Sequence, residues 1–229
     1  MRNLLTTNIF KQEASIAHSQ ILSYAYPWQA VEKIPQIVAN VISNLSSDFK
    51  EIAEGVYVFD GTALPPSATI LGPCVIDRGA EIRTGAYVRG NAIIGKDTVI
   101  GNSCEIKNAI IYDGAQIPHF NYVGNSILGY KAHLGAGAII SNLKADKSSV
   151  FVSYNGKKTD TGLRKFGAIL GDYAEIGCGS VLNPGTIVLP NSNIYPLSSV
   201  RGVVPESSIY KSQGNIVPKQ KKRVKEYLP

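Results

Sequence analysis

Cysteine, histidine and long apolar runs are all scarce in this sequence. The three cysteines, Cys74, Cys104 and Cys178, are too few and too scattered for a disulfide framework or a CxxC zinc site, and we expect them to be inert. No apolar run approaches the roughly 18 residues that a membrane span needs. The first twenty residues have neither the unbroken apolar region nor the small-residue cleavage site of a signal peptide. We therefore expect a cytoplasmic protein without a metal site.

Charged residues are also sparse, at 17% of the 229 residues, whereas hydrophobic residues make up 44%. This composition excludes a wholly disordered chain and leaves room for one large core. The net charge of +6 reflects two basic groups. Neither group is interleaved with aromatic residues, so the sequence does not favour nucleic-acid binding. The groups are Lys144, Lys147, Lys157, Lys158, Arg164 and Lys165, and, in the last eleven positions, Lys219, Lys221, Lys222, Arg223 and Lys225.

An aliphatic residue recurs every six positions over most of the chain. Nine of these residues follow one another without a miss from Val58 to Ile106, and with two one-residue slips the pattern continues to Ile140. It resumes from Leu170 to Val200, and a small residue precedes most of the aliphatic positions by two. A helix cannot produce a period of six, and an ordinary strand meander would not hold it over nine units. The repeat therefore sets the fold.

The repeat predicts a solenoid of short strands. Each unit would supply one strand and one turn, so three units complete a triangular coil of about 18 residues, and the chain has room for about six coils. The aliphatic and small residues would point into the prism. Glycine follows several aliphatic positions, and we expect positive φ there. These glycines are Gly95, Gly101, Gly124, Gly129, Gly135, Gly171 and Gly177.

We expect a solenoid domain at 57–205. Three segments fall outside the repeat: one before this domain, one inside it and one after it. Residues 1–56 predict one or two helices, which we expect to cap the open end of the prism. Residues 143–168 interrupt the repeat with an excursion that contains the hairpin signal Asn155-Gly156, and loops this long are usually functional. Residues 206–229 form a basic tail that we expect to pack as a strand or helix against a neighbour.

Motifs between Arg89 and Asn142 resemble the acetyltransferase domain of bifunctional UDP-N-acetylglucosamine pyrophosphorylase/glucosamine-1-phosphate N-acetyltransferases. They are YVRG at 87–90, GNSCEIK at 101–107, HFNYVG at 119–124 and LGAG at 134–137, and their spacings agree without gaps. The segment TGLRKFGAILGD at 161–172 is similar to the C-terminal solenoid of archaeal-type sugar-1-phosphate nucleotidylyltransferases. The resemblance covers about residues 57–205. These relatives are hexapeptide-repeat transferases, so the resemblance implies an all-β solenoid, the left-handed parallel β-helix, with a small N-terminal helical segment.

The resemblance also implies a reaction, transfer of an acetyl group from acetyl-CoA to the amine of a glucosamine-1-phosphate-like sugar or a nucleotide amino sugar in UDP-N-acetylglucosamine biosynthesis. It implies a homotrimer with its sites between neighbouring prisms. The relatives carry a nucleotidyltransferase domain that this chain lacks, so a separate nucleotidyltransferase chain is an expected partner. By position, the resemblance makes His119 the general base, Arg89, Lys107, Tyr122, His133 and Asn142 substrate-binding residues, and Ala136, Cys178 and Pro196 cofactor-binding residues.

The residue types suit this chemistry. An amine attacks a thioester only when it is unprotonated, and a neutral imidazole is a suitable proton acceptor near neutral pH. Arg89 offers two parallel guanidinium N–H groups and Lys107 offers a compact positive charge, and both bind a phosphate monoester. They are eighteen residues apart, so we expect them to stack on one face of successive coils, with His119 on a different strand.

Departures from the family pattern leave alternatives open. His133 stands where the acetyltransferases have an asparagine, and Cys178 and Pro196 replace small residues on the cofactor side. An alternative is therefore a non-catalytic solenoid that binds sugar phosphates or serves as a scaffold. A third hypothesis is a zinc lyase of the hexapeptide-repeat carbonic anhydrase class, but His119 and His133 are too far apart in sequence for its close histidine pair.

Overall fold

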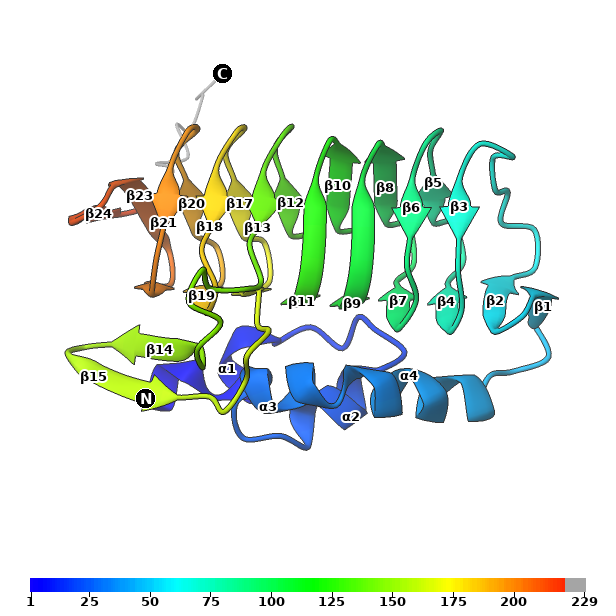
Figure 1. Ribbon diagram of the computed structural model, residues 1–229, viewed down its shortest axis with the longest axis horizontal. Coiled ribbons are helices and arrows are strands. Elements are labelled where there is room, and N and C mark those ends of the chain that lie inside the picture. Colours follow the sequence, from blue (N-terminus) through cyan, green and yellow to red (C-terminus); the bar gives the residue numbers. More distant parts are fainter. Residues whose placement is uncertain (221–229) are drawn as a thin grey trace, which may run out of the picture.

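The computed structural model describes residues 1–220. The chain winds into a long prism of short strands, and a layer of helices runs along one side of it (Figure 1). Stacked strands on each face of the prism are parallel, which confirms the predicted all-β solenoid of the left-handed β-helix class. Within residues 1–220, no helix is long and apolar enough to cross a membrane.

The prism has three faces, each a ladder of parallel strands. The helix-covered face contains β2 (Val56–Phe59), β4 (Cys74–Ile76), β7 (Ala92–Ile94), the second halves of β9 (Glu105–Ile111) and β11 (Tyr122–Leu128), β16 (Ala168–Leu170), β19 (Thr186–Val188) and β22 (Val203–Val204). The open face contains β3 (Thr69–Ile70), β6 (Tyr87–Val88), the first halves of β9 and β11, β13 (Ile139–Ile140), β18 (Val181–Leu182) and β21 (Ser199–Val200). The third face contains β5 (Glu81–Ile82), β8 (Val99–Asn102), β10 (Gln116–His119), β12 (His133–Leu134), β17 (Glu175–Ile176), β20 (Asn193–Ile194) and β23 (Ser208–Ser212).

The aliphatic residues that recur every six positions fill the inside of the prism. Aliphatic residues of the repeat form one continuous core, in which Val88, Ile106 and Leu182 are fully buried. Leu64 and Ile70, in the first coil, are only partly buried because no complete coil lies below them. Eight strands stack on the helix-covered face, so the prism has more coils than the six that the sequence predicted.

The prediction that the glycines after the aliphatic positions adopt positive φ is wrong. A Cβ at Gly101 would lie 1.5 Å from the carbonyl oxygen of Pro118 in the next coil, and one at Gly177 would lie 2.4 Å from the nitrogen of Pro196. Glycine is therefore needed there because stacked coils approach closely. Positive φ occurs a few residues away, at corner positions such as Ser103, Phe120 and Leu197.

The N-terminal helices lie along the side of the prism and do not cap its end, so that expectation is also wrong (Figure 1). Their apolar side chains pack on an outward-facing row of aliphatic residues on the helix-covered face. In α4 (Ile34–Ser43), Ile34, Ile37, Val38 and Val41 form a buried stripe, and Ile42 is partly buried beside it. The elements are η1 (Arg2–Leu4), α1 (Thr6–Ile9), α2 (His18–Leu22), α3 (Pro27–Glu32) and α4 (Ile34–Ser43). The outward row is Val75, Ile93, Ile110, Ile127, Ile169 and Ile187.

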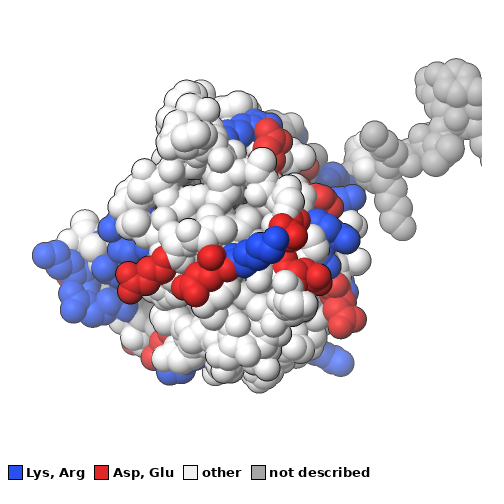
Figure 2. Space-filling view, turned by 90° about the vertical axis from the view of Figure 1, so that its right-hand side faces the viewer, with Lys and Arg blue, Asp and Glu red and all other residues white. Residues whose placement is uncertain are grey.

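Antiparallel hairpins close the two ends of the ladders. At one end, β1 (Phe49–Ala53) pairs with β2, and Lys50 forms a 2.8 Å ion pair with Asp60. Figure 2 shows a band of Asp and Glu side chains with Lys or Arg among them across this end, and charges of this kind discourage pairing with another sheet edge. At the other end, β23 continues the third face beyond the predicted boundary at 205, and β24 (Asn215–Pro218) pairs with it. The rest of the predicted basic tail, from residue 221, lies outside the described residues.

The excursion folds back against the prism. Its centre is the hairpin of β14 (Phe151–Tyr154) and β15 (Lys157–Asp160), as the Asn155-Gly156 signal predicted. Both turn residues have positive φ, 48° and 73°, which suits a tight two-residue turn. After the hairpin the chain returns to the ladder, where Ile169 pairs with Ile127.

Candidate functional site

Two edges of the open face hold most of the predicted site residues. The first, which we call the Arg89 corner, consists of the positions that directly follow the inward aliphatic residue of each open-face strand. Strand register places these positions in one column. The column contains Arg89, Lys107, Gly124, Ser141, Asn183 and Arg201. Arg89 and Lys107 therefore stack on successive coils, as predicted.

A carboxylate of the next coil holds the Arg89 guanidinium. Nη1 of Arg89 lies 2.7 Å from Oε1 of Glu105, and the guanidinium carbon lies 5.8 Å from the centre of the Tyr87 ring. The hydrogen bond to Glu105 raises the pKa of Arg89, so this side chain is a permanent cation. The Glu105 carboxylate is the first contact that an incoming phosphate would have to replace.

Tyr122 and Asn142 also meet at the Arg89 corner. Nδ2 of Asn142 donates to the Tyr122 hydroxyl at 3.2 Å and to Oδ1 of Asn125 at 2.7 Å. The Tyr122 side chain passes over Gly124, where a Cβ would lie 2.5 Å from the Tyr122 oxygen, so a larger residue there would displace Tyr122 and Asn142. Burial, and then the Glu105 charge, raise the pKa of Tyr122, so its hydroxyl stays protonated as a donor.

The second edge, which we call the His119 corner, joins the third face to the open face. Backbone hydrogen bonds stack its members, with Gly137 N donating to His119 O at 3.0 Å, Gly179 N to Ala136 O at 2.9 Å and Leu197 N to Cys178 O at 2.9 Å. The corner column contains Asn102, His119, Ala136, Cys178 and Pro196. The predicted base thus shares one column with all three predicted cofactor-binding residues.

The buried Asn121 holds the backbone around His119. Its Oδ1 accepts the His119 N–H at 3.1 Å, and its Nδ2 donates to the carbonyl oxygens of Gly135 and Ala138 at 2.9 and 3.0 Å. The His119 side chain itself is exposed, and its ring centre lies 6.5 Å from that of Phe120, which is 60% exposed. An apolar side chain therefore stands beside the imidazole.

His133 is not part of either corner. It lies in the middle of the third face, where its Nδ1 is 2.9 Å from Oε2 of Glu175 on the next coil. Sequence reasoning missed the contact residues Glu105, Asn121 and Glu175. Glu105 could have been found, because it lies within the GNSCEIK motif, whereas the Glu175 contact depends on an excursion that separates it from His133 by 42 residues.

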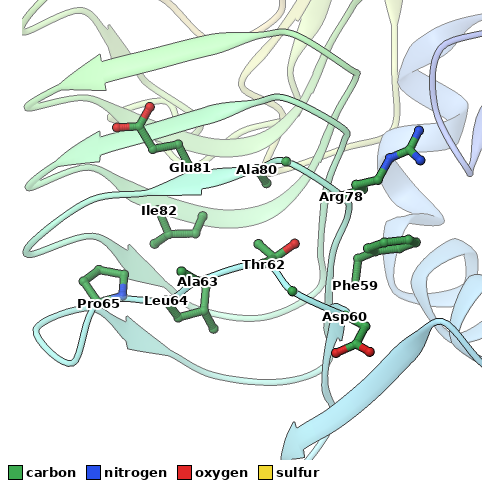
Figure 3. A pocket seen from close by; sticks show the side chains of 12 residues that line it. Phe59, Asp60, Thr62, Ala63, Leu64, Pro65, Arg78, Ala80, Glu81 and Ile82 are labelled. Atoms are coloured by element: carbon green, nitrogen blue, oxygen red, sulfur yellow. The ribbon is translucent and has the colours of Figure 1, made fainter.

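A large hollow lies elsewhere, at the end of the prism that carries β2. It has a volume of about 580 Å³ and is lined by residues 59–65 and 78–82. Figure 3 shows Leu64 and Ile82 at this unfinished end of the core, with Arg78 beside the Phe59 ring. None of the predicted site residues lines this hollow, and it lies where the stack of coils ends. Within residues 1–220, no group of three or more His, Cys, Asp or Glu side chains is placed to hold a metal ion.

The fold and the repeat define a hexapeptide-repeat protein. Comparison with known families shows to which of the hexapeptide-repeat families the chain belongs. The sequence model of the GMPPB C-terminal domain matches residues 70–201, more than half of the chain. The chain belongs to this family.

Curated relatives include bifunctional archaeal enzymes. A bifunctional sugar-1-phosphate nucleotidylyltransferase/acetyltransferase from Sulfurisphaera tokodaii is 35% identical over 109 residues, which are 48% of this chain and 27% of that protein. The bifunctional protein GlmU of Methanococcus maripaludis is 33% identical over 200 residues, 86% of this chain and 48% of that protein. The chain thus spans about half or less of the length of these relatives.

Solved structures with a similar fold include a mutant of perosamine N-acetyltransferase from Caulobacter crescentus in complex with CoA and GDP-perosamine. It is 16% identical, with a TM-score of 0.34 over 68% of this chain and 55% of that chain. The acetyltransferase domain of PglB from Neisseria gonorrhoeae, in complex with acetyl coenzyme A, is 15% identical, with a TM-score of 0.32 over 80% of this chain and 63% of that chain.

Proposed function

We propose that the protein is a sugar N-acetyltransferase, which moves an acetyl group from acetyl-CoA to the amine of an amino-sugar phosphate or nucleotide amino sugar. The observation that carries the proposal is the pair of corners. His119 stacks with Ala136, Cys178 and Pro196 at one edge of the open face, and Arg89 stacks with Lys107 at its other edge. The acetyltransferase half of the named activity of the Sulfurisphaera tokodaii relative supports the same class of reaction.

The Arg89 corner would bind the sugar phosphate. Arg89 can present two N–H groups to two phosphate oxygens, and the half-buried Lys107 adds a point charge one coil away. Tyr122 and Asn142, already joined by a hydrogen bond, would contact the sugar hydroxyls. His133 stands where the acetyltransferases have an asparagine, but it lies with Glu175 on the third face and outside the Arg89 corner, so it would meet the sugar only from a neighbouring protomer.

His119 would accept the proton of the attacking amine. The amine nitrogen forms a bond to the thioester carbonyl carbon, the carbon–sulfur bond breaks, and the sulfur leaves with the electron pair. The proton taken up by the imidazole then passes to the leaving thiolate, which restores neutral His119. The exposed imidazole is open to such a substrate, and the Asn121 contacts fix the backbone that carries it.

The His119 corner fits an extended thioester arm. Ala136, Cys178 and Pro196 carry no long or charged side chain, so a chain of methylene and amide groups would lie against them without displacing an ion pair. Acetyl-CoA would supply the activated acetyl group there. The acetyl end would then lie near His119, next to Ala136 in the column.

We also propose a homotrimer. Large apolar side chains remain exposed on and beside the open face, including Phe120, Val181, Tyr195 and Leu197, of which Leu197 is 85% exposed. The helices cover one of the three faces of the prism, and these exposed apolar side chains lie at the open face and its His119 corner, so a second copy would pack there. Packing of two prisms there would bring the His119 corner of one protomer to the Arg89 corner of another.

The test is release of free thiol from acetyl-CoA in the presence of glucosamine-1-phosphate and a panel of amino sugars and their nucleotide forms. His119→Asn should lower kcat by about 10²–10⁴-fold. His18→Asn, a substitution in the helical layer, is the matched control and should retain activity. Saturable binding of a sugar phosphate without thiol release by the parent protein would favour the alternative, a non-catalytic sugar-phosphate-binding solenoid.

A further inference from the structure

We propose that the groove between the β14–β15 hairpin and the prism binds the phosphate group of a small molecule, at a site separate from Arg89 and Lys107. Figure 1 shows the hairpin beside the C-terminal half of the prism. The proposal does not depend on acetyl transfer.

Two glycines allow the hairpin to approach the prism closely. A Cβ at Gly185 would lie 2.7 Å from a methyl carbon of Val150 and 2.9 Å from the carbonyl oxygen of Phe151. A Cβ at Gly202 would lie 3.3 Å from the carbonyl oxygen of Ser153. On the other side of the hairpin, Asn3 Nδ2 donates to the Tyr154 hydroxyl at 3.1 Å. The hairpin is therefore fixed from two sides, and so is the groove beneath it.

Three cationic side chains from three different segments line this groove. Lys144 comes from the start of the excursion, Lys158 from β15, and Arg201 from the Arg89 corner. Together with Phe151 and Pro184, they surround a hollow of about 180 Å³. A second hollow of about 460 Å³ shares Lys144 and Arg201 with the first, so the two form one groove.

Few carboxylates neutralise these cations. Lys144 Nζ donates to Ser148 Oγ and lies 3.5 Å from Oδ2 of Asp146, the one carboxylate that lines the groove. Within residues 1–220, neither Lys158 nor Arg201 forms an ion pair. The nearby Asp160 is a second carboxylate. Hydrogen bonds from the Ser149 hydroxyl and the Gly162 N–H, and then the charges of Lys144 and Lys158, lower its pKa, so it stays ionised. Three cations thus face two carboxylates. The groove therefore keeps a net positive charge.

The mixture of donors suits a phosphate group. Arg201 offers a planar fork of N–H groups, and Lys144 and Lys158 offer ammonium donors around it. Lys158 Nζ also lies 4.2 Å from the centre of the Phe151 ring, which places this charge on the inner side of the hairpin. The two hollows hold about 180 and 460 Å³, and Phe151 is the single aromatic residue that lines them, whereas single-strand binding uses several stacked aromatic rings, which favours a small molecule over a nucleic acid.

The groove is too far from Arg89 and Lys107 to share one phosphate with them. Arg201 belongs to the same corner column, but three strands lie between it and Lys107. Neighbouring strands are about 4.8 Å apart, so four steps separate the two side chains by about 19 Å. Lys107 and Arg201 thus define two anion sites on one corner.

Calorimetric titration at constant ionic strength would test the proposal, with inorganic pyrophosphate and ADP as separate ligands. Arg201→Ala and Lys158→Ala should each weaken binding by about tenfold or more, because each removes a charge-assisted contact. Lys157→Ala is the matched control. Its side chain alternates to the other side of the same strand, so affinity should stay within about twofold. Arg89→Ala and His119→Asn should leave this affinity unchanged, whatever they do to acetyl transfer.

The two ligands distinguish the source of the phosphate. Equal affinities would show that the groove recognises the phosphate alone, and tighter binding of ADP would show that it takes a nucleotide, and either result supports the proposal. Absence of saturable binding would overturn it. So would an equal loss in Lys157→Ala, which indicates diffuse charge, or an equal loss in Arg89→Ala, which places the anion at the other end of the corner.

Discussion

Arg89 and Glu105 face each other across neighbouring coils of the open face, with 2.7 Å between Nη1 and Oε1. The pair is partly exposed, so solvent screens it and it contributes little to folding. Arg89→Ala should therefore leave the thermal midpoint within about 2 °C of the parent value. The same variant should lower kcat/KM for a sugar-phosphate acceptor by at least about tenfold. Thermal unfolding and thiol-release kinetics on one preparation check both halves.

Glu105→Gln removes the other partner of the Arg89–Glu105 ion pair and leaves the Arg89 cation in place. It removes the carboxylate with which a sugar phosphate would compete for Arg89 under the proposed function, so the acceptor should bind up to about fivefold more tightly. Weaker binding in Glu105→Gln would mean that the carboxylate positions Arg89 for the phosphate, and would contradict the competition described here.

The sequence predicted three inert cysteines, but the structure exposes Cys178, so the three should differ sharply in reactivity. Burial raises the pKa of Cys74 to about 12 and also raises that of Cys104, whereas Cys178 is exposed. Only a thiolate reacts readily, so native protein should show one fast thiol and denatured protein three. Acetyl-CoA should slow the fast reaction if it lies along the His119 corner. Ellman titration measures the counts, and Cys178→Ser should lack the fast phase. A fast thiol that acetyl-CoA leaves unprotected would argue against this position for the cofactor.

The helical layer should depend on the outward aliphatic row. Ile110 is fully buried between the prism and the helices, so Ile110→Ala should lower the free energy of unfolding by about 2–5 kcal/mol. Ile52→Ala, at a position 57% exposed, should change it by less than about 0.5 kcal/mol. Urea unfolding followed by fluorescence of Trp28, the single tryptophan, measures both. Similar losses in the two variants would indicate that the helices do not depend on this contact.

Asp172 should give stability a measurable pH dependence. Its carboxylate accepts backbone N–H groups of Lys11, Gln12 and Tyr130 at 2.8, 3.1 and 3.0 Å, yet burial outweighs these bonds and raises its pKa. Between the unfolded value near pH 4 and the higher folded value, the folded state binds more protons, so the free energy of unfolding falls as pH rises.

Comparison of the parent with Asp172→Asn isolates this contribution, because the other carboxyl groups are common to both. The difference in unfolding free energy, parent minus variant, should decrease across that pH range and then level off. Urea denaturation at a series of pH values from 3.5 to about 7 provides the measurement. A difference that increased with pH would mean that the backbone N–H groups dominate and that the pKa is lowered.

The interior of the prism could be predicted almost completely from the sequence. A position such as Ile106 contacts only side chains of its own coil and of the coils above and below, so a local period determines its environment. The position of the helices was missed, although the sequence contains a signal for it. Ile93 and Ile110 directly precede inward aliphatic residues, and such a second aliphatic residue recurs once per coil. An outward row of that length needs a cover along the side of the prism.

The candidate site was predictable in part for the same reason. The stacking of Arg89 on Lys107 follows from their spacing, and the stacking of Ala136 on His119 follows from the 17-residue coil in which they lie. The contact between His133 and Glu175, and the approach of Lys158 to Arg201, depend on how the excursion leaves the prism and returns to it. No periodic pattern contains that information.

The excursion leaves the ladder without disturbing it. Leu128 pairs with Ile111, 17 residues earlier, and with Leu170, 42 residues later, so 25 additional residues are accommodated within one turn of the solenoid. Each coil requires only that the chain return in register, whatever its path outside. The point where the excursion leaves the prism could therefore accept loops of other lengths and compositions. Such an exchange would change what the protein recognises while the prism stays intact.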